Sequence, residues 1–189
     1  MPAVSAGLLL YHRRPDPGTG DLRLEVLLVH PGGPYWAKKD KGAWSIPKGE
    51  AEPDELGPEP GTVTAAKLRN RAAGVDLLAV ARREVREETG LEPDGPFRPL
   101  GGVKAHHHKL IFAWAVEHDC DPGGLAGSTF TIEWSPRSGK AAEFPAVDRA
   151  AWFGLAAARE AIVPAQRRFL DDLQVVVAAG AVGLAADPD

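Results

Sequence analysis

Residues 79–91 read Ala-Val-Ala-Arg-Arg-Glu-Val-Arg-Glu-Glu-Thr-Gly-Leu and predict the C-terminal part of a helix. The stretch consists of good helix formers without proline, and Gly90 stands where a left-handed residue would cap the helix. Leu78, Ala81 and Val85 form an apolar stripe at helical spacing. We therefore expect this helix to pack against a sheet.

Three carboxylates share one face of the same helix, because Glu84, Glu87 and Glu88 lie at i, i+3 and i+4. Like charges so close repel one another at neutral pH, so a positive charge should sit among them. Ligands that are all oxygen favour Mg²⁺ or Mn²⁺. A solvated acidic face explains the helix alone about equally well.

The segment upstream favours the metal interpretation. Residues 44–49, Trp-Ser-Ile-Pro-Lys-Gly, supply a strand end followed by a turn that contains glycine. Together with the helix they resemble the Nudix hydrolase signature, G-x5-E-x7-R-E-U-x-E-E-x-G-U, in which U is a bulky aliphatic residue. Gly49 matches the opening glycine. The second half is matched without a gap by Arg83, Glu84, Val85, Glu87, Glu88, Gly90 and Leu91.

This resemblance covers about residues 4–155 and implies an α/β protein, a Nudix-type α/β/α sandwich with a central mixed β-sheet. It also implies a hydrolase that cleaves the pyrophosphate linkage of a nucleoside diphosphate linked to another group. Water would attack phosphorus with the help of Mg²⁺ or Mn²⁺. Glu84, Glu87 and Glu88 would be the catalytic residues and metal ligands, with Glu84 as ligand or general base. Arg83, Gly49 and Gly90 would be structural.

Further ligands are assigned by the same resemblance. The backbone carbonyl of Lys48 would complete the metal shell, and its side chain would meet phosphate. Many Nudix enzymes take an additional glutamate from beyond the signature, for which Glu143, on an expected loop, is preferred over Glu133.

The chain departs from the signature in its middle. If Glu55 is the first signature glutamate, then 27 residues separate it from Arg83 where the pattern has seven. If Val75 takes that position, the helix stays in register but the carboxylate is lost. Either way about 20 residues are inserted, at about 51–74. The inserted segment, with a marginal helix near 64–72, is either a surface insertion or a basic flap over the site.

Substrate contacts are expected from loops near the signature. The loop 31–42 offers Tyr35 or Trp36 for stacking on a base, and Lys39, Lys38 or Lys41 for phosphate. A plain surface loop explains this segment slightly better. Arg137 lies in a Gly/Ser turn and could grip phosphate. His106–His108 cannot all face one metal, because neighbouring side chains alternate in a strand. One of these histidines contacting substrate is the more plausible role.

The remaining sequence predicts one domain at residues 1–180, followed by a tail at 181–189. A net charge of −4 gives no reason to expect nucleic acid or a membrane as partner, so the expected partner is a small phosphoanhydride substrate. The single cysteine, Cys120, excludes an internal disulfide and fits a reducing cytoplasm. A monomer or homodimer is expected.

Strands are predicted at 3–11, 22–30, 98–103, 109–117, 128–134 and 144–153, and helices at 155–163 and 166–179.

The amino-acid sequence does not identify the substrate. The approach to the signature resembles that of Nudix members acting on dinucleoside polyphosphates or diphosphoinositol polyphosphates, and oxidised nucleoside triphosphates are a further class. A catalytically silent Nudix fold that senses a nucleotide is the alternative function, and the insertion is the feature in its favour.

Overall fold

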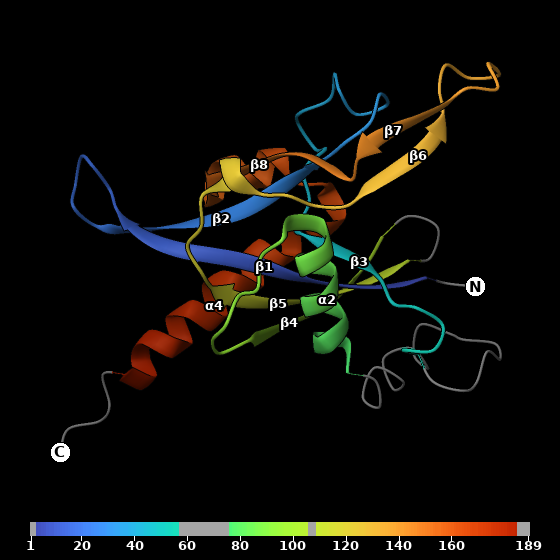
Figure 1. Cartoon of the computed structure of the whole chain (residues 1–189). Coiled ribbons are helices and arrows are strands. Elements are labelled where there is room, and N and C mark those ends of the chain that lie inside the picture. Colours follow the sequence, from blue (N-terminus) through green and yellow to red (C-terminus); the bar gives the residue numbers. More distant parts are fainter. Residues whose placement is uncertain (1–2, 57–75, 106–108, 185–189) are drawn as a thin grey trace.

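A mixed β-sheet forms the centre of the molecule (Figure 1). The computed structural model describes residues 3–56, 76–105 and 109–184. Within these ranges the sheet has six strands: β1 (Val4–Pro15), β2 (Leu22–Pro31), β3 (Lys48–Glu50), β4 (Arg98–Lys104), β5 (Leu110–Glu117) and β8 (Val147–Gly154). A separate two-stranded sheet is made by β6 (Thr129–Glu133) and β7 (Ala141–Pro145).

Strand β1 is the hub of the central sheet, whose order is β4-β5-β1-β2-β8, with β3 also paired to β1. β1 runs parallel to β5 and antiparallel to both β2 and β3. Its residues from Val4 to Tyr11 are all buried, as expected for a central strand covered on both faces. The predicted hairpin of the first two strands is thereby confirmed.

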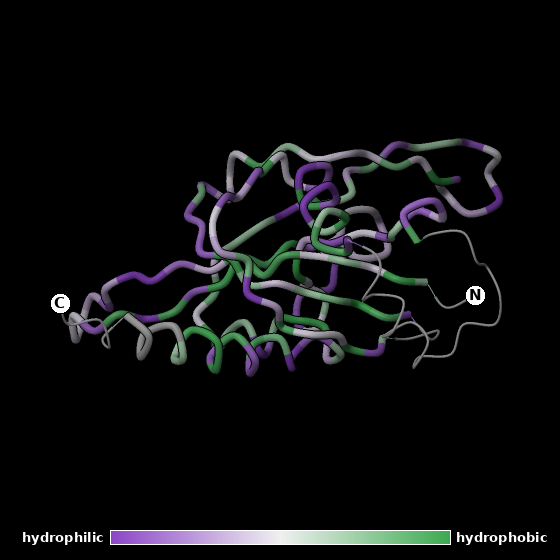
Figure 2. Tube along the Cα trace, turned by 90° about the horizontal axis from the view of Figure 1, so that it is seen from below, coloured by the Kyte–Doolittle hydropathy of each residue, from purple (hydrophilic) through white to green (hydrophobic). Residues whose placement is uncertain are grey.

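Helices cover both faces of the sheet. α2 (Leu77–Thr89) packs its buried side chains against one set of strand residues, which includes Ala6, Leu8 and Leu10. α3 (Leu155–Ala161) and α4 (Arg167–Leu184) cover the other face. In Figure 2 apolar strands run through the middle of the molecule and α4 lies along one side of them. The fold is the predicted α/β/α sandwich with a mixed sheet.

The alternation along β1 explains why two separate cores form. Leu8 and Leu10 point toward α2, whereas Leu9 and Tyr11 point toward α3 and α4. Within α4, Leu170 and Leu173 are fully buried, as their helical spacing predicts. Short 3₁₀ turns lie at Pro122–Gly124 and at Pro164–Gln166, where Pro164 divides the two C-terminal helices.

The strand predicted at 144–153 is divided between β7, which ends at Pro145, and β8, which begins at Val147. Two further segments have a secondary structure other than the predicted one. Lys48 and Gly49 belong to strand β3 rather than to a turn, because β3 pairs with Ser5–Gly7 of β1. Glu143 lies on strand β7 rather than on a loop, because residues 141–145 find hydrogen-bonding partners in β6. The pairing of β3 is not visible in local sequence, since it depends on the distant strand β1. β7 is the return strand of a hairpin with β6.

Several predictions fall outside the described residues: the marginal helix at 64–72, Val75, His106–His108 and the last five residues of the expected tail. α4 runs to Leu184, five residues past its predicted end. None of the helices in the described ranges is long and apolar enough to cross a membrane.

We predict that replacing Leu173 by alanine lowers the free energy of unfolding by about 2–5 kcal/mol, because it opens a cavity beneath α4. Leu173 is 0% exposed. Val175→Ala is the matched control on the same helix, since Val175 is 68% exposed, and should change stability by less than about 0.5 kcal/mol. Urea unfolding followed by circular dichroism measures both. Equal effects would contradict the packing of α4 described above.

Candidate active site

Both ends of helix α2 are fixed by caps, which sets the rotation of its carboxylates. The Asp76 carboxylate accepts a hydrogen bond from the backbone N–H of Ala79 at 3.0 Å. At the other end Gly90 has φ of 75° and donates its N–H to the carbonyl of Arg86 at 2.8 Å. The left-handed backbone conformation costs little free energy at this position because the residue is glycine.

The helix approaches strand β3 very closely at Gly49. A Cβ atom on Gly49 would lie 1.6 Å from Oε2 of Glu84, so only glycine leaves room for that carboxylate. One residue earlier, the backbone N–H of Lys48 donates to Oε2 of Glu88 at 2.8 Å. Two of the three predicted catalytic carboxylates therefore rest directly on β3.

Arg83 is the centre of a carboxylate network beside these contacts. Its guanidinium donates two hydrogen bonds to Glu55, from Nε to Oε1 at 2.9 Å and from Nη2 to Oε2 at 2.8 Å. Nη1 donates to Glu84 at 2.7 Å and to Glu87 at 3.2 Å. These partners, Glu55 first, raise the pKa of Arg83, and the bonds from Arg83 lower the pKa of Glu55.

The network shows which residue pairs with the signature arginine. Glu55 reaches Arg83 in spite of the 27 residues between them. The fork of two parallel bonds is the strongest geometry available to an arginine and a carboxylate. The structure thus places the carboxylate of Glu55 where it can support the helix. Val75 lies outside the described residues.

Charge is concentrated on both sides of β3. Burial raises the pKa of Glu84 and of Glu88, because the charged carboxylate loses contact with water. Burial also lowers the pKa of Lys48, against the attraction of Glu88. The positive charge expected among the carboxylates is present in the form of Arg83, with Lys48 nearby.

The donor atoms on this face fit a hard divalent cation in type. Glu84 and Glu87 each use one oxygen for Arg83, and Glu88 uses one for Lys48. The second oxygen of each carboxylate takes no hydrogen bond from the described residues, which leaves three oxygens on one helix face. Mg²⁺ and Mn²⁺ prefer such ligands. Within the described ranges, no three acidic, histidine or cysteine side chains already converge as a metal site.

The C-terminal end of α2 is covered by residues 126–128. A Cβ atom on Gly127 would lie 1.9 Å from the carbonyl oxygen of Glu88. The N–H of Ser128 donates to the carbonyl of Glu87 at 2.9 Å. The β6–β7 hairpin starts directly after this contact, so it is anchored at the carboxylate end of the helix.

The two candidates for an additional glutamate lie on that hairpin. Glu143 accepts a hydrogen bond from the Thr129 hydroxyl, and Glu133 accepts one from the N–H of Gly139 at 2.8 Å. Neither hydrogen bond leads to the signature helix. Glu143 is exposed on the hairpin, so a role as metal ligand stays a prediction.

The residues predicted to contact substrate lie on the loop 31–42 and on the β6–β7 hairpin. Tyr35 is 61% exposed, and its ring meets that of Trp134 edge-on at 5.4 Å. The ammonium of Lys39 lies 4.6 Å from the centre of the Trp36 ring. Arg137 sits in the β6–β7 connection with φ of 65°. The loop of residues 32–36 and the hairpin therefore meet, while Arg137 marks the hairpin end.

One charged pair escaped the sequence analysis. Lys109 donates to Glu50 at 2.7 Å and so joins the start of β5 to β3. Lys109 follows three histidines and belongs to no recognisable motif. Its contact with Glu50 arises because β3 and β5 flank the same end of β1.

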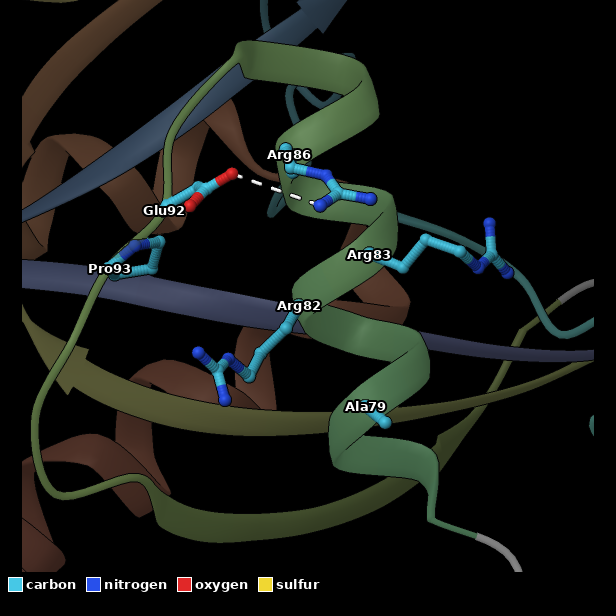
Figure 3. A pocket seen from close by; sticks show the side chains of 6 residues that line it. All are labelled: Ala79, Arg82, Arg83, Arg86, Glu92 and Pro93. Atoms are coloured by element: carbon cyan, nitrogen blue, oxygen red, sulfur yellow. Dashed lines mark ion pairs between the residues drawn. The ribbon is translucent and has the colours of Figure 1, made fainter.

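A cavity on α2 lies apart from the carboxylate face. It has a volume of about 280 Å³ and is lined by Ala79, Arg82, Arg83, Arg86, Glu92 and Pro93. Figure 3 shows Arg83 turned away from Arg82 and Pro93, toward the segment that follows β3. With one carboxylate among three arginines, this cavity lacks the ligands that a divalent cation needs.

Comparison with known structures identifies the fold. A Nudix-family protein (mutT/nudix) from Listeria innocua superposes with a TM-score of 0.57 at 15% identity, over 96% of this chain and 98% of that one. The Ap4A hydrolase of C. elegans gives 0.56 at 17% identity, over 93% and 98% of the two chains. The NUDIX domain of Shewanella oneidensis NrtR, complexed with ADP ribose, gives 0.53 at 13% identity, over 94% and 89%.

No protein-family model matches the chain, and no curated protein sequence is significantly similar to it. The likeness is therefore one of architecture. The chain has the Nudix fold, and the resemblance drawn from its signature is confirmed at that level.

We predict that Gly49→Ala lowers the free energy of unfolding by about 1–3 kcal/mol, because the added methyl group would occupy the position of the Glu84 carboxylate. Gly124→Ala is the control: it is exposed, and the nearest atom to its Cβ would lie 3.9 Å away. That variant should change stability by less than about 1 kcal/mol. Thermal unfolding compares the two. A Gly49→Ala protein as stable as Gly124→Ala would contradict the close approach.

A double-mutant cycle of Arg83→Met and Glu55→Gln should give a coupling free energy of at least about 1 kcal/mol, since the pair is forked and both side chains are about three-quarters buried. The control cycle, Arg86→Met with Glu92→Gln, removes a 3.8 Å pair whose side chains are mostly exposed. It should couple by less than about 0.5 kcal/mol. Similar coupling in both cycles would rule out Glu55 as the particular partner of Arg83.

Proposed function

We propose that this protein is a divalent-metal-dependent hydrolase that cleaves the pyrophosphate linkage of a nucleoside diphosphate joined to another group. The observation that carries the proposal is the contact of Glu84 and Glu88 with Gly49 and Lys48 of β3. An acidic helix needed only for solubility would have no reason to bury two carboxylates against a strand.

Each residue of the candidate site has a separate role in this proposal. Glu84, Glu87 and Glu88 would hold Mg²⁺ or Mn²⁺ through their oxygens without hydrogen bonds, together with the carbonyl of Lys48. The metal would neutralise the bridging phosphates and lower the pKa of the attacking water. Arg83 and Glu55 orient the carboxylates, and Lys48 neutralises the product phosphate.

Proton transfer falls to Glu84 in this proposal. Glu84 serves either as metal ligand or as general base, since both roles need its Oε2 oxygen. As general base it would accept the proton of the water that attacks phosphorus while the bond to the leaving phosphate breaks. Burial raises the pKa of Glu84, which makes its carboxylate a stronger base than an exposed glutamate. No covalent intermediate is required.

Dinucleoside polyphosphates are the substrate class to examine first. The structural neighbour from C. elegans is an Ap4A hydrolase, and the Shewanella neighbour holds ADP ribose. Both ligands contain an adenosine linked through phosphoanhydride bonds. Tyr35 and Trp134 would offer an aromatic surface to one base, and Lys39 and Arg137 would meet distal phosphates. A cytoplasmic location, where such nucleotides occur, belongs to the same proposal.

The experiment measures hydrolysis of diadenosine tetraphosphate, ADP ribose, a diphosphoinositol polyphosphate and ordinary and oxidised nucleoside triphosphates with Mg²⁺ or Mn²⁺. We expect turnover of at least one compound, reduced about 100-fold or more in Glu87→Gln and in Glu88→Gln. Glu92→Gln, which lies just beyond the helix and pairs only loosely with Arg86, should retain full activity. Loss of activity in Glu92→Gln alone would contradict the assignment.

Removal of metal gives an independent prediction. Treatment with EDTA should abolish turnover and leave the circular dichroism spectrum unchanged, because the sandwich is held by its two apolar cores. Added Mg²⁺ or Mn²⁺ should restore activity. Turnover that persists in EDTA would contradict metal dependence.

The second candidate, a nucleotide sensor without catalysis, is favoured by one observation. Arg83 already holds two of the three carboxylates, Glu84 and Glu87. Nucleotide binding without turnover of any compound in the panel would support this function over hydrolysis.

A further inference from the structure

Two lysines and a glutamate form a charged group on the side of β3 that faces away from α2. Successive side chains of a strand point to opposite faces, so Lys48 and Glu50 share one face while Gly49 faces the helix. In the register of the sheet Lys48 lies opposite Gly7 of β1. A Cβ on Gly7 would approach that of Lys48 to 2.5 Å, so the missing side chain makes room for Lys48.

Lys109 enters this group from the neighbouring strand. It directly precedes β5, whose first residues pair with Val4 and Ser5, and Ser5 also pairs with Glu50 of β3. Glu50 and Lys109 therefore straddle the same end of β1, where their side chains meet at 2.7 Å.

Lys109 lies beside the candidate active site through its partner. Glu50 follows Lys48 by two residues on β3, and the backbone N–H of Lys48 donates to Glu88 at 2.8 Å. The pair of Lys109 with Glu50 therefore flanks the strand segment on which the carboxylates rest.

The pair of Lys109 with Glu50 is weak enough to exchange. The side chains are 31% and 59% exposed, and exposed pairs contribute only about 0–1 kcal/mol. A phosphate carries more charge than a carboxylate and offers more acceptor oxygens, so it competes well for an ammonium group. Among the described strands β3 pairs only with β1, which leaves its other edge without a partner strand where an anion could approach.

We propose that Lys109 binds a phosphate of the substrate, and that Glu50 is the internal counter-ion that this phosphate displaces. The inference rests on the proposed function, since it concerns a phosphoanhydride ligand at the same site. The proposal adds to the site a basic residue that the signature does not contain. It also predicts that loss of Lys109 weakens binding of the phosphate ligand, whereas loss of the Glu50 charge strengthens it.

The test is isothermal titration of the wild-type protein with the non-hydrolysable α,β-methylene analogue of ADP in Mg²⁺, with adenosine as the phosphate-free probe. Lys109→Met should weaken binding of the analogue about 10-fold, as expected for one charge-assisted hydrogen bond. Glu50→Gln should strengthen it about 2- to 5-fold, because Lys109 loses its competing partner. Binding of adenosine should not change in either variant.

Lys104→Met is the matched control, since Lys104 is exposed on the adjoining strand β4 and opposite Leu110, and its loss changes the net charge equally. It should weaken binding less than 2-fold, because it forms no part of the group. If Lys109→Met equals Lys104→Met, or if Glu50→Gln and Lys109→Met weaken binding alike, the pair is only a structural link and the inference is wrong. Binding of the analogue as described, without turnover of any substrate, would instead contradict only the hydrolase proposal.

Discussion

The close approach of α2 to β3 at Gly49 is the constraint on which the site depends. Because this position has no side chain, the Glu84 carboxylate rests on the strand, and Glu88 then reaches the N–H of Lys48. β3 in turn is fixed by its pairing with β1, the hub of the sheet. The carboxylates are thus positioned by the core of the fold rather than by a loop, as a precise catalytic site requires.

A second contact explains how the chain accommodates its insertion. With Glu55 as the first signature glutamate, the extra residues lie between Glu55 and Arg83, and Asp76 caps the helix that carries Arg83. Both ends of the insertion are therefore tied to α2, one through the side chain of Arg83 and the other through the helix cap. Extra residues between two anchored points cost little, because loop-closure entropy rises slowly with length. The signature network can persist without the usual spacing.

The sequence was most informative where the pattern was local and periodic. The helix with its left-handed cap, the first hairpin and the buried α4 stripe follow from spacing and apolar runs. The sandwich class was implied by the resemblance of the signature to the Nudix family. Strand β3 could not be predicted in this way, because a short polar segment becomes a strand only when a distant edge is available. Strand β7 was missed because it contains no apolar run, although its partner is the neighbouring strand β6. The choice between Glu55 and Val75 likewise depended on a contact across the insertion, and Lys109 acquires meaning only beside Glu50.

The central claim is that the oxygens of Glu84, Glu87 and Glu88 without hydrogen-bond partners in the described structure form a divalent-metal site. The most direct measurement is anomalous diffraction from crystals soaked in Mn²⁺. We predict a peak bound by oxygens of at least two of these carboxylates, with Arg83 retained on Glu55. A peak elsewhere in the molecule, or none while Arg83 still holds Glu84 and Glu87, would contradict the account.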